Sequence, residues 1–72
     1  MKKTFKLENL DCANCAAKMQ AGIEAIDGVT YASVNFIMQK MTLEAPDDRF
    51  EAIFKEAVKV CRKVEPDIEI IK

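Results

Sequence analysis

Apolar residues recur along this chain with two different periods, and the order of these periods restricts the fold more than any other feature. A period of two predicts a strand, and a period of 3.6 predicts a helix. Alternating segments, which predict strands, are residues 4–8, 31–36, 40–44 and 68–70. Helical spacing runs from Cys15 to Ile26 and again from Phe50 to Val64. The expected order is therefore strand, helix, strand, strand, helix, strand.

The residues between these segments predict where each element ends. Asp27 and Gly28 are expected to stop the first helix, with Gly28 in the left-handed conformation that follows a helix end. Pro46 precedes the second helix, and Asp48 with Glu51 three residues later fits a capping box. Only about four residues separate the second strand from the third, so these two strands are expected to form a hairpin.

This order of elements predicts one α+β domain, residues 1–72. Two βαβ halves with right-handed crossovers give a four-stranded antiparallel sheet with both helices on one face. Three connections then share one end of the sheet: the loop after the first strand, the hairpin turn near residues 37–39, and the loop at 64–66. Cys12 lies in the first of these connections, and Cys61 lies just before the third.

Composition excludes several classes of function. The net charge is −1 with mixed signs, which argues against nucleic-acid binding because that requires a basic face. No apolar run predicts a signal peptide or a membrane helix, so a cytoplasmic domain without direct membrane insertion is expected. Three cysteines are too few and odd in number for a secreted disulfide scaffold. With no histidine, one copy of the chain cannot build a closed four-ligand zinc site of Cys and His.

The segment from Asp11 to Cys15 carries the candidate chemistry. Cys12 and Cys15 lie at i and i+3 across a loop-to-helix junction, so both sulfurs can face one point. Free N–H groups at a helix N-terminus favour the thiolate, which is the form that binds metal. Asp11 adds a hard oxygen ligand, and this set suits a divalent ion better than Cu(I), for which two thiolates suffice.

A CxxC pair has other interpretations. A thiol–disulfide oxidoreductase would also need a low thiol pKa, but such enzymes use a larger fold and often an aromatic residue or proline in the motif. Two buried apolar cysteines form a second alternative, against which the polar residues Asp11 and Asn14 argue. Asp11 has an alternative of its own, as a cap of the first helix.

The remaining sulfur atoms have two interpretations each. Cys61 falls on the apolar stripe of the second helix, which predicts a core residue. Its position near the end of that helix also makes it a candidate third thiolate for large ions such as Pb(II) and Cd(II). Met19 and Met41 fall on apolar faces and are expected in the core, whereas Met38 in the hairpin turn could be exposed or bind metal.

Three segments together resemble the heavy-metal-associated domain family. They are Asn9-Leu10-Asp11-Cys12-Ala13-Asn14-Cys15-Ala16, Ile26-Asp27-Gly28-Val29 and Val34-Asn35-Phe36, in the order and spacing of the family. The resemblance covers essentially the whole chain. It implies a ferredoxin-like βαββαβ fold and metal binding through Cys12 and Cys15.

Within this family, Asp before the first cysteine resembles the branch that exports Zn, Cd and Pb, because copper members usually carry Gly-Met-Thr or a close variant there. The segment Val64-Glu65-Pro66-Asp67-Ile68 is similar to the cadmium branch as well. The resemblance thus implies the N-terminal cytosolic domain of a P-type ATPase, with Zn(II), Cd(II) or Pb(II) as cargo and the ATPase transport core as partner. The domain itself would be no enzyme, and would be a monomer or a metal-bridged dimer. The alternative is a free-standing soluble metallochaperone for Zn/Cd or Cu(I).

Overall fold

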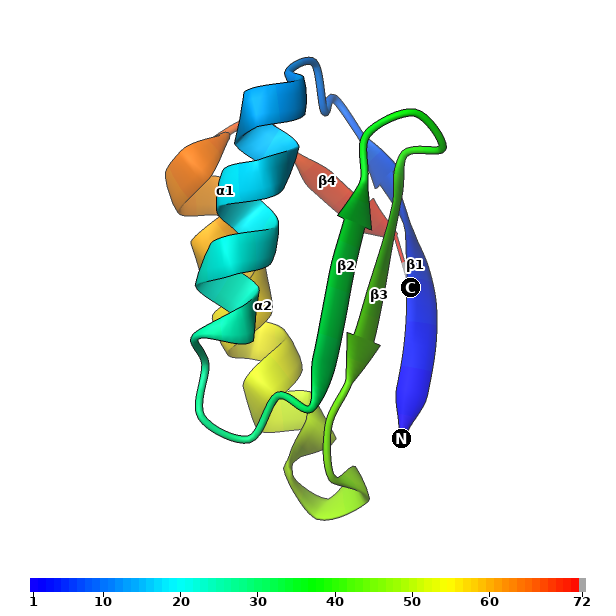
Figure 1. Ribbon diagram of the computed structural model, residues 1–72, viewed down its shortest axis with the longest axis vertical. Helices are drawn as coiled ribbons and strands as arrows, with labels where there is room; N and C mark the ends of the chain where they lie inside the picture. Colours follow the sequence, from blue (N-terminus) through cyan, green and yellow to red (C-terminus); the bar gives the residue numbers. More distant parts are fainter. Residues whose placement is uncertain (72) are drawn as a thin grey trace.

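The computed structural model describes residues 1–71 of the 72-residue chain, so Lys72, the last residue of the expected 1–72 domain, lies outside the described residues. The elements follow one another in the expected order (Figure 1): β1 (Lys2–Glu8), α1 (Ala13–Glu24), β2 (Tyr31–Asn35), β3 (Lys40–Glu44), a 3-10 turn (Asp47–Arg49), α2 (Phe50–Val64) and β4 (Glu69–Ile71). Within residues 1–71, no helix is both long and apolar enough to cross a bilayer.

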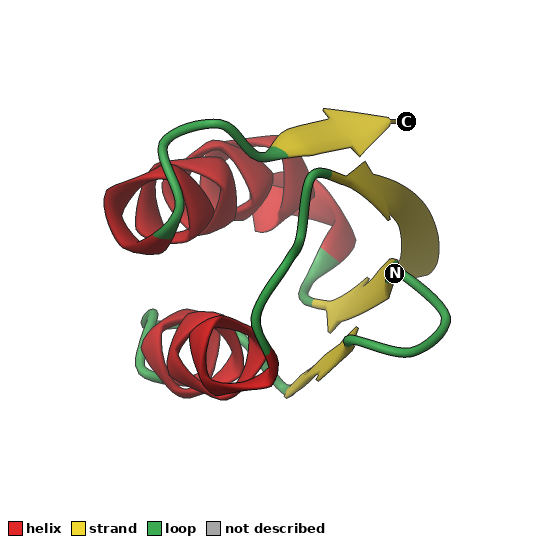
Figure 2. Cartoon of the chain, turned by 90° about the horizontal axis from the view of Figure 1, so that it is seen from above, coloured by secondary structure: helices red, strands yellow, loops and turns green. Residues whose placement is uncertain are grey.

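The four strands form one antiparallel sheet in the order β2-β3-β1-β4. Both helices pack against the same face of this sheet, as Figure 2 shows from above. Phe5 pairs with Met41, and Met41 pairs in turn with Val34, so apolar residues of three strands stand in one row. All three are buried. The sequence-based prediction of an α+β fold with a four-stranded antiparallel sheet and both helices on one face is confirmed.

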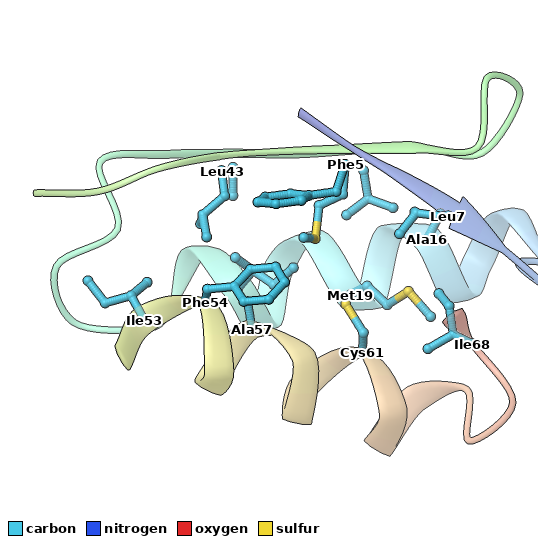
Figure 3. Packing of buried hydrophobic residues seen from close by; sticks show 14 of the residues in the cluster. Phe5, Leu7, Ala16, Met19, Leu43, Ile53, Phe54, Ala57, Cys61 and Ile68 are labelled. Atoms are coloured by element: carbon cyan, nitrogen blue, oxygen red, sulfur yellow. The ribbon is translucent and has the colours of Figure 1, made fainter. Parts of the chain in front are cut away.

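The core lies between the sheet and the two helices (Figure 3). The ring of Phe5 from β1 packs against that of Phe54 from α2 in a tilted arrangement, with ring centroids 4.7 Å apart. The helices themselves approach closely at Gly22, because a Cβ built there would lie 2.5 Å from a methyl carbon of Val60. A glycine in a helix interior costs about 1 kcal/mol relative to alanine. At Gly22 the absence of a Cβ allows α1 and α2 to pack closely despite this cost.

Two helix boundaries differ from the expectation. α1 begins at Ala13 rather than Cys15, because Cys12 itself serves as the N-cap. α1 ends at Glu24, before the expected stop at Asp27 and Gly28. Gly28 does adopt a positive φ of 100°, but in the turn that leads to β2 rather than directly after the helix.

The predicted capping box of Asp48 and Glu51 is wrong. Asp48 lies inside the 3-10 turn, where the N–H of Arg49 donates to the carbonyl of Pro46 at 3.1 Å. Arg49 is the N-cap of α2, and its side chain makes no capping hydrogen bond. Because the 3-10 turn after Pro46 includes Asp48, α2 begins one residue later than a capping box at Asp48 requires.

A side chain of α1 forms a hydrogen bond with the backbone of β2, which is an edge strand of the sheet. The backbone N–H of Val34 donates to Oε1 of Gln20 at 3.0 Å. Because Gln20 belongs to α1, this bond attaches the helix that follows the CxxC loop to the edge strand of the sheet.

Candidate metal site

Three connections meet at one end of the sheet, the upper end in Figure 1. The end of β1 bonds the hairpin turn, because the N–H of Leu7 donates to the carbonyl of Gln39 at 2.8 Å. The loop after β1 bonds the same turn, because the carbonyl of Leu10 accepts from Nε2 of Gln39 at 2.8 Å. The same loop bonds the connection after α2, because Nδ2 of Asn9 donates to the carbonyl of Asp67 at 3.0 Å. The side chain of Leu10, in this loop, is buried in the core. The expectation that these connections share one end is confirmed.

Cys12 occupies the N-cap position of α1. Its backbone is extended, and its sulfur accepts a hydrogen bond from the backbone N–H of Cys15 at 3.4 Å. A side-chain acceptor normally fills this place with the oxygen of Ser, Thr, Asp or Asn. The bond from the Cys15 N–H is the largest cause that lowers the pKa of the Cys12 thiol, followed by a bond with the Cys15 side chain. Cys12 is partly exposed, so its thiolate is accessible.

Cys15 has the opposite behaviour. Its side-chain hydrogen bond with Cys12 raises the pKa of its thiol most, followed by partial burial and by the negative charges of Cys12 and Glu65. The two thiols therefore lose their protons in order, Cys12 first. Glu65 caps the end of α2, so its effect on Cys15 is a further sign that the connection after α2 faces the CxxC loop.

Asp11, the predicted oxygen ligand, is exposed in the loop between β1 and α1. In the part of the chain that the structure describes, no three Cys, Asp or Glu side chains stand close enough together to hold one metal ion. The structure thus brings Cys12 and Cys15 together, and it leaves the Asp11 carboxylate outside. Since the cap of α1 is Cys12, the alternative of Asp11 as the N-cap residue is not what the structure shows.

Cys61 is fully buried in the core and belongs to the same apolar cluster as Met19 (Figure 3). Burial raises the pKa of its thiol to about 11. As a ligand it would have to leave this position, so its role as a third thiolate stays a prediction. Met19 and Met41 are buried as expected, and Met38 is exposed in the hairpin turn.

Comparison with known proteins identifies the family. The model of the heavy-metal-associated domain matches residues 4–68. The chain belongs to this family. A heavy-metal-associated domain is a metal-binding domain, and the expectation from the sequence motifs is confirmed at this level.

Curated relatives are metal-transporting ATPases. The chain is 27% identical over 70 residues to a cadmium, zinc and cobalt-transporting ATPase of Bacillus subtilis. The aligned region covers 97% of this chain and 10% of that protein. It is 34% identical over 74 residues to a copper-exporting P-type ATPase of the same organism, over 94% of this chain and 9% of the relative. The chain thus spans a tenth or less of the length of these relatives.

Solved structures agree on the fold. The N-terminal domain of a potential copper-translocating P-type ATPase from Bacillus subtilis, in a Cu(I)-loaded state, matches with a TM-score of 0.76 and 27% identity, over 97% of this chain and 82% of that one. A CopZ metallochaperone matches with a TM-score of 0.75 and 17% identity, over 99% and 100% of the two chains. This heavy-metal-associated domain is therefore related to ATPase domains and has the fold of a metallochaperone.

Sequence reasoning missed two residues at this end of the sheet. Glu65 influences the Cys15 thiol, and the expected position of the 64–66 connection was the signal that could have found it. Gln39 bonds the loop that carries the motif. No residue pattern marks it, because its role depends on a backbone conformation.

Proposed function

We propose that this heavy-metal-associated domain binds one divalent soft or borderline ion, Zn(II), Cd(II) or Pb(II), through Cys12 and Cys15 with Asp11 as an oxygen ligand. The observation that carries the proposal is the hydrogen bond from the Cys15 N–H to the Cys12 sulfur at a helix N-terminus. That bond prepares a thiolate at an accessible position. The second thiolate forms as the ion displaces the proton of Cys15.

Divalent ions are favoured over Cu(I) by Asp11. Two thiolates satisfy Cu(I), whereas Zn(II) and Cd(II) prefer further ligands and tolerate oxygen. The Asp11 carboxylate is one residue from Cys12 and exposed, so rotation of its side chain is the movement that the proposal requires. Relatives named for cadmium and zinc transport support this choice, and the copper-exporting relative keeps Cu(I) as the competing cargo.

The domain would act as the N-terminal cytosolic domain of a heavy-metal-exporting P-type ATPase. It would pass its ion to the transport core or regulate that core, and it would itself carry out no catalysis. The ATPase relatives support this role. A free-standing metallochaperone is the second candidate, which the CopZ-like fold favours. Transfer of the metal ion from this domain, as a free protein, to an ATPase transport core on a separate chain would support the chaperone role.

The first prediction tests the two thiolates. Cys12→Ser or Cys15→Ser is expected to lower Cd(II) affinity by at least about a hundredfold, because thiolates supply most of the binding energy for a soft ion. Competition titration, followed by the ultraviolet absorption of Cd–thiolate bonds, measures this loss. Circular dichroism of each variant controls for the fold. Full Cd–thiolate absorption in Cys12→Ser would show that the site lies elsewhere.

The second prediction tests selectivity. Asp11→Ala is expected to lower Zn(II) affinity about tenfold and to leave Cu(I) affinity equal or higher, since the carboxylate is a ligand only for the divalent ion. Competition titrations with both ions on both proteins measure the ratio of affinities. Asp67→Ala, which removes an exposed carboxylate from the neighbouring connection, is the matched control. Equal losses for Zn(II) and Cu(I) would remove Asp11 from the site.

A further inference from the structure

One side chain of the hairpin turn holds the loop that precedes Cys12. Nε2 of Gln39 donates to the carbonyl of Leu10 at 2.8 Å and also to the carbonyl of Phe36 at 2.8 Å. The backbone carbonyl of Gln39 accepts from the N–H of Leu7 at 2.8 Å. Gln39 therefore bonds Leu7 at the end of β1 and Leu10 in the loop. Leu10 is two residues before Cys12.

Gln39 makes these bonds from an unfavourable backbone conformation. Its φ is 53°, in the left-handed region, where glycine is the residue without a steric cost. Non-glycine residues held in this region concentrate at functional sites, where the surrounding contacts maintain them. The contacts here are the three hydrogen bonds of Gln39, and two of them end on the segment that leads to Cys12.

The other side of the same loop is held in the same way. Asn9 has a φ of 68°, and its side-chain amide donates to the carbonyl of Asp67. Leu10, between the two bonded positions, is buried. The backbone is thus fixed up to the residue before Asp11, and the Asp11 side chain is exposed. With its backbone held, Asp11 needs only side-chain rotation to reach an ion bound at Cys12 and Cys15.

We infer that Gln39 is a positioning residue that sets metal selectivity by fixing the backbone from which Asp11 projects. This inference rests on the proposed function. A divalent ion that uses the carboxylate benefits from a loop ordered before binding, because ordering a backbone residue during binding opposes affinity. An ion that needs only the two thiolates gains little, because Cys12 and Cys15 are already placed by the start of α1.

Gln39→Gly is the decisive variant. Glycine accepts the left-handed conformation, so the turn keeps its backbone while the side-chain bonds are removed. Cd(II) affinity is expected to fall about tenfold, the scale of ordering a single residue, with Cu(I) affinity within about threefold of the original. Gln20→Ala is the matched control, since it also removes a glutamine bond to the backbone, at Val34. It is expected to leave the ratio of Cd(II) to Cu(I) affinity unchanged.

A double-mutant cycle identifies the residue through which Gln39 acts. In an Asp11→Ala background, Gln39→Gly is expected to lower Cd(II) affinity by less than about twofold, because the positioned group is already absent. A full tenfold loss in that background, an equal loss for Cd(II) and Cu(I), or no loss in the single variant would each overturn the inference.

Backbone order in the metal-free chain separates this inference from the proposed function. ¹⁵N order parameters at residues 9–11 are expected to fall in Gln39→Gly and to remain unchanged in Gln20→Ala. Unchanged order parameters in Gln39→Gly would overturn the inference even if Cd(II) binding is as proposed. If instead Cys12→Ser retains full Cd(II) binding, the proposed function is wrong, whatever the order parameters show.

Discussion

The chain places the same side chain in two opposite environments. Cys12 stands at the start of α1, partly exposed, where a backbone N–H lowers the pKa of its thiol. Cys61 stands on the inner face of α2, fully buried, where desolvation raises the pKa of its thiol to about 11. The difference shows that position in the fold decides whether a cysteine thiol is accessible to a ligand or enclosed in the core. Three predictions test it.

The largest expected difference is in reactivity. Alkylation of Cys61 by iodoacetamide in the folded chain should be more than about a hundredfold slower than alkylation of Cys12, because a pKa of about 11 and burial both remove accessible thiolate. Because the pKa of the Cys12 thiol is lowered and that of the Cys15 thiol is raised, the reaction at Cys12 should reach half its maximal rate at a lower pH than the reaction at Cys15. Peptide mass spectrometry at a series of pH values measures all three rates. Denatured protein, in which the rates should converge, is the control. Similar rates at Cys12 and Cys61 in the folded chain would break the comparison.

The next difference is in stability. Cys61→Ser should lower the free energy of unfolding by about 2 kcal/mol, because a hydroxyl replaces a weakly polar thiol in an apolar core. Cys12→Ser should change it by less than about 0.5 kcal/mol, since serine is itself a favoured N-cap. Urea unfolding of the metal-free, reduced proteins measures both. Cys61→Ala separates the loss of packing from the burial of the hydroxyl. Equal effects at positions 12 and 61 would contradict the assignment of environments.

The smallest expected effect concerns metal affinity at Cys61. Cys61→Ala should leave Zn(II) affinity within about twofold of the original, because the Cys61 thiol is enclosed in the core. The sequence also allowed a third thiolate for Pb(II) or Cd(II), which would require the last turn of α2 to open. A tenfold loss of Pb(II) affinity in Cys61→Ala, measured by competition, would show that opening. Cys61 would then join the metal site.

Much of the fold could be predicted from residue pattern alone. β3 has the predicted bounds Lys40–Glu44, and the apolar stripe of α2 includes Cys61 as expected. Alternation and helical spacing carry this information because they describe which side of an element faces the core. The start of α1 could not be predicted as well. Cysteine is an unusual N-cap, and the pattern of apolar residues begins only after Cys12.

The candidate ligand residues of the site could be predicted from the sequence, but the hydrogen bonds that hold their loop could not. Asp11, Cys12 and Cys15 lie within one segment of five residues, so a local motif reveals them, although their role as ligands stays a prediction. Gln39 is 29 residues from Leu10, whose carbonyl it bonds. Neither glycine nor a turn motif marks its left-handed backbone. Long-range hydrogen bonds of this kind follow from the packed structure, which no local pattern encodes.

The bond between Gln20 and Val34 has a consequence for aggregation. β2 is an edge strand, and an edge with free N–H groups can pair with another chain. At Val34 that N–H is already bonded to α1. Strand addition at this position requires the Gln20 side chain to leave Val34 first. Heat or a mutation that loosens α1 would therefore expose the edge at the same moment as it disturbs the cysteine loop, so loss of metal binding and self-association of the chain should begin together.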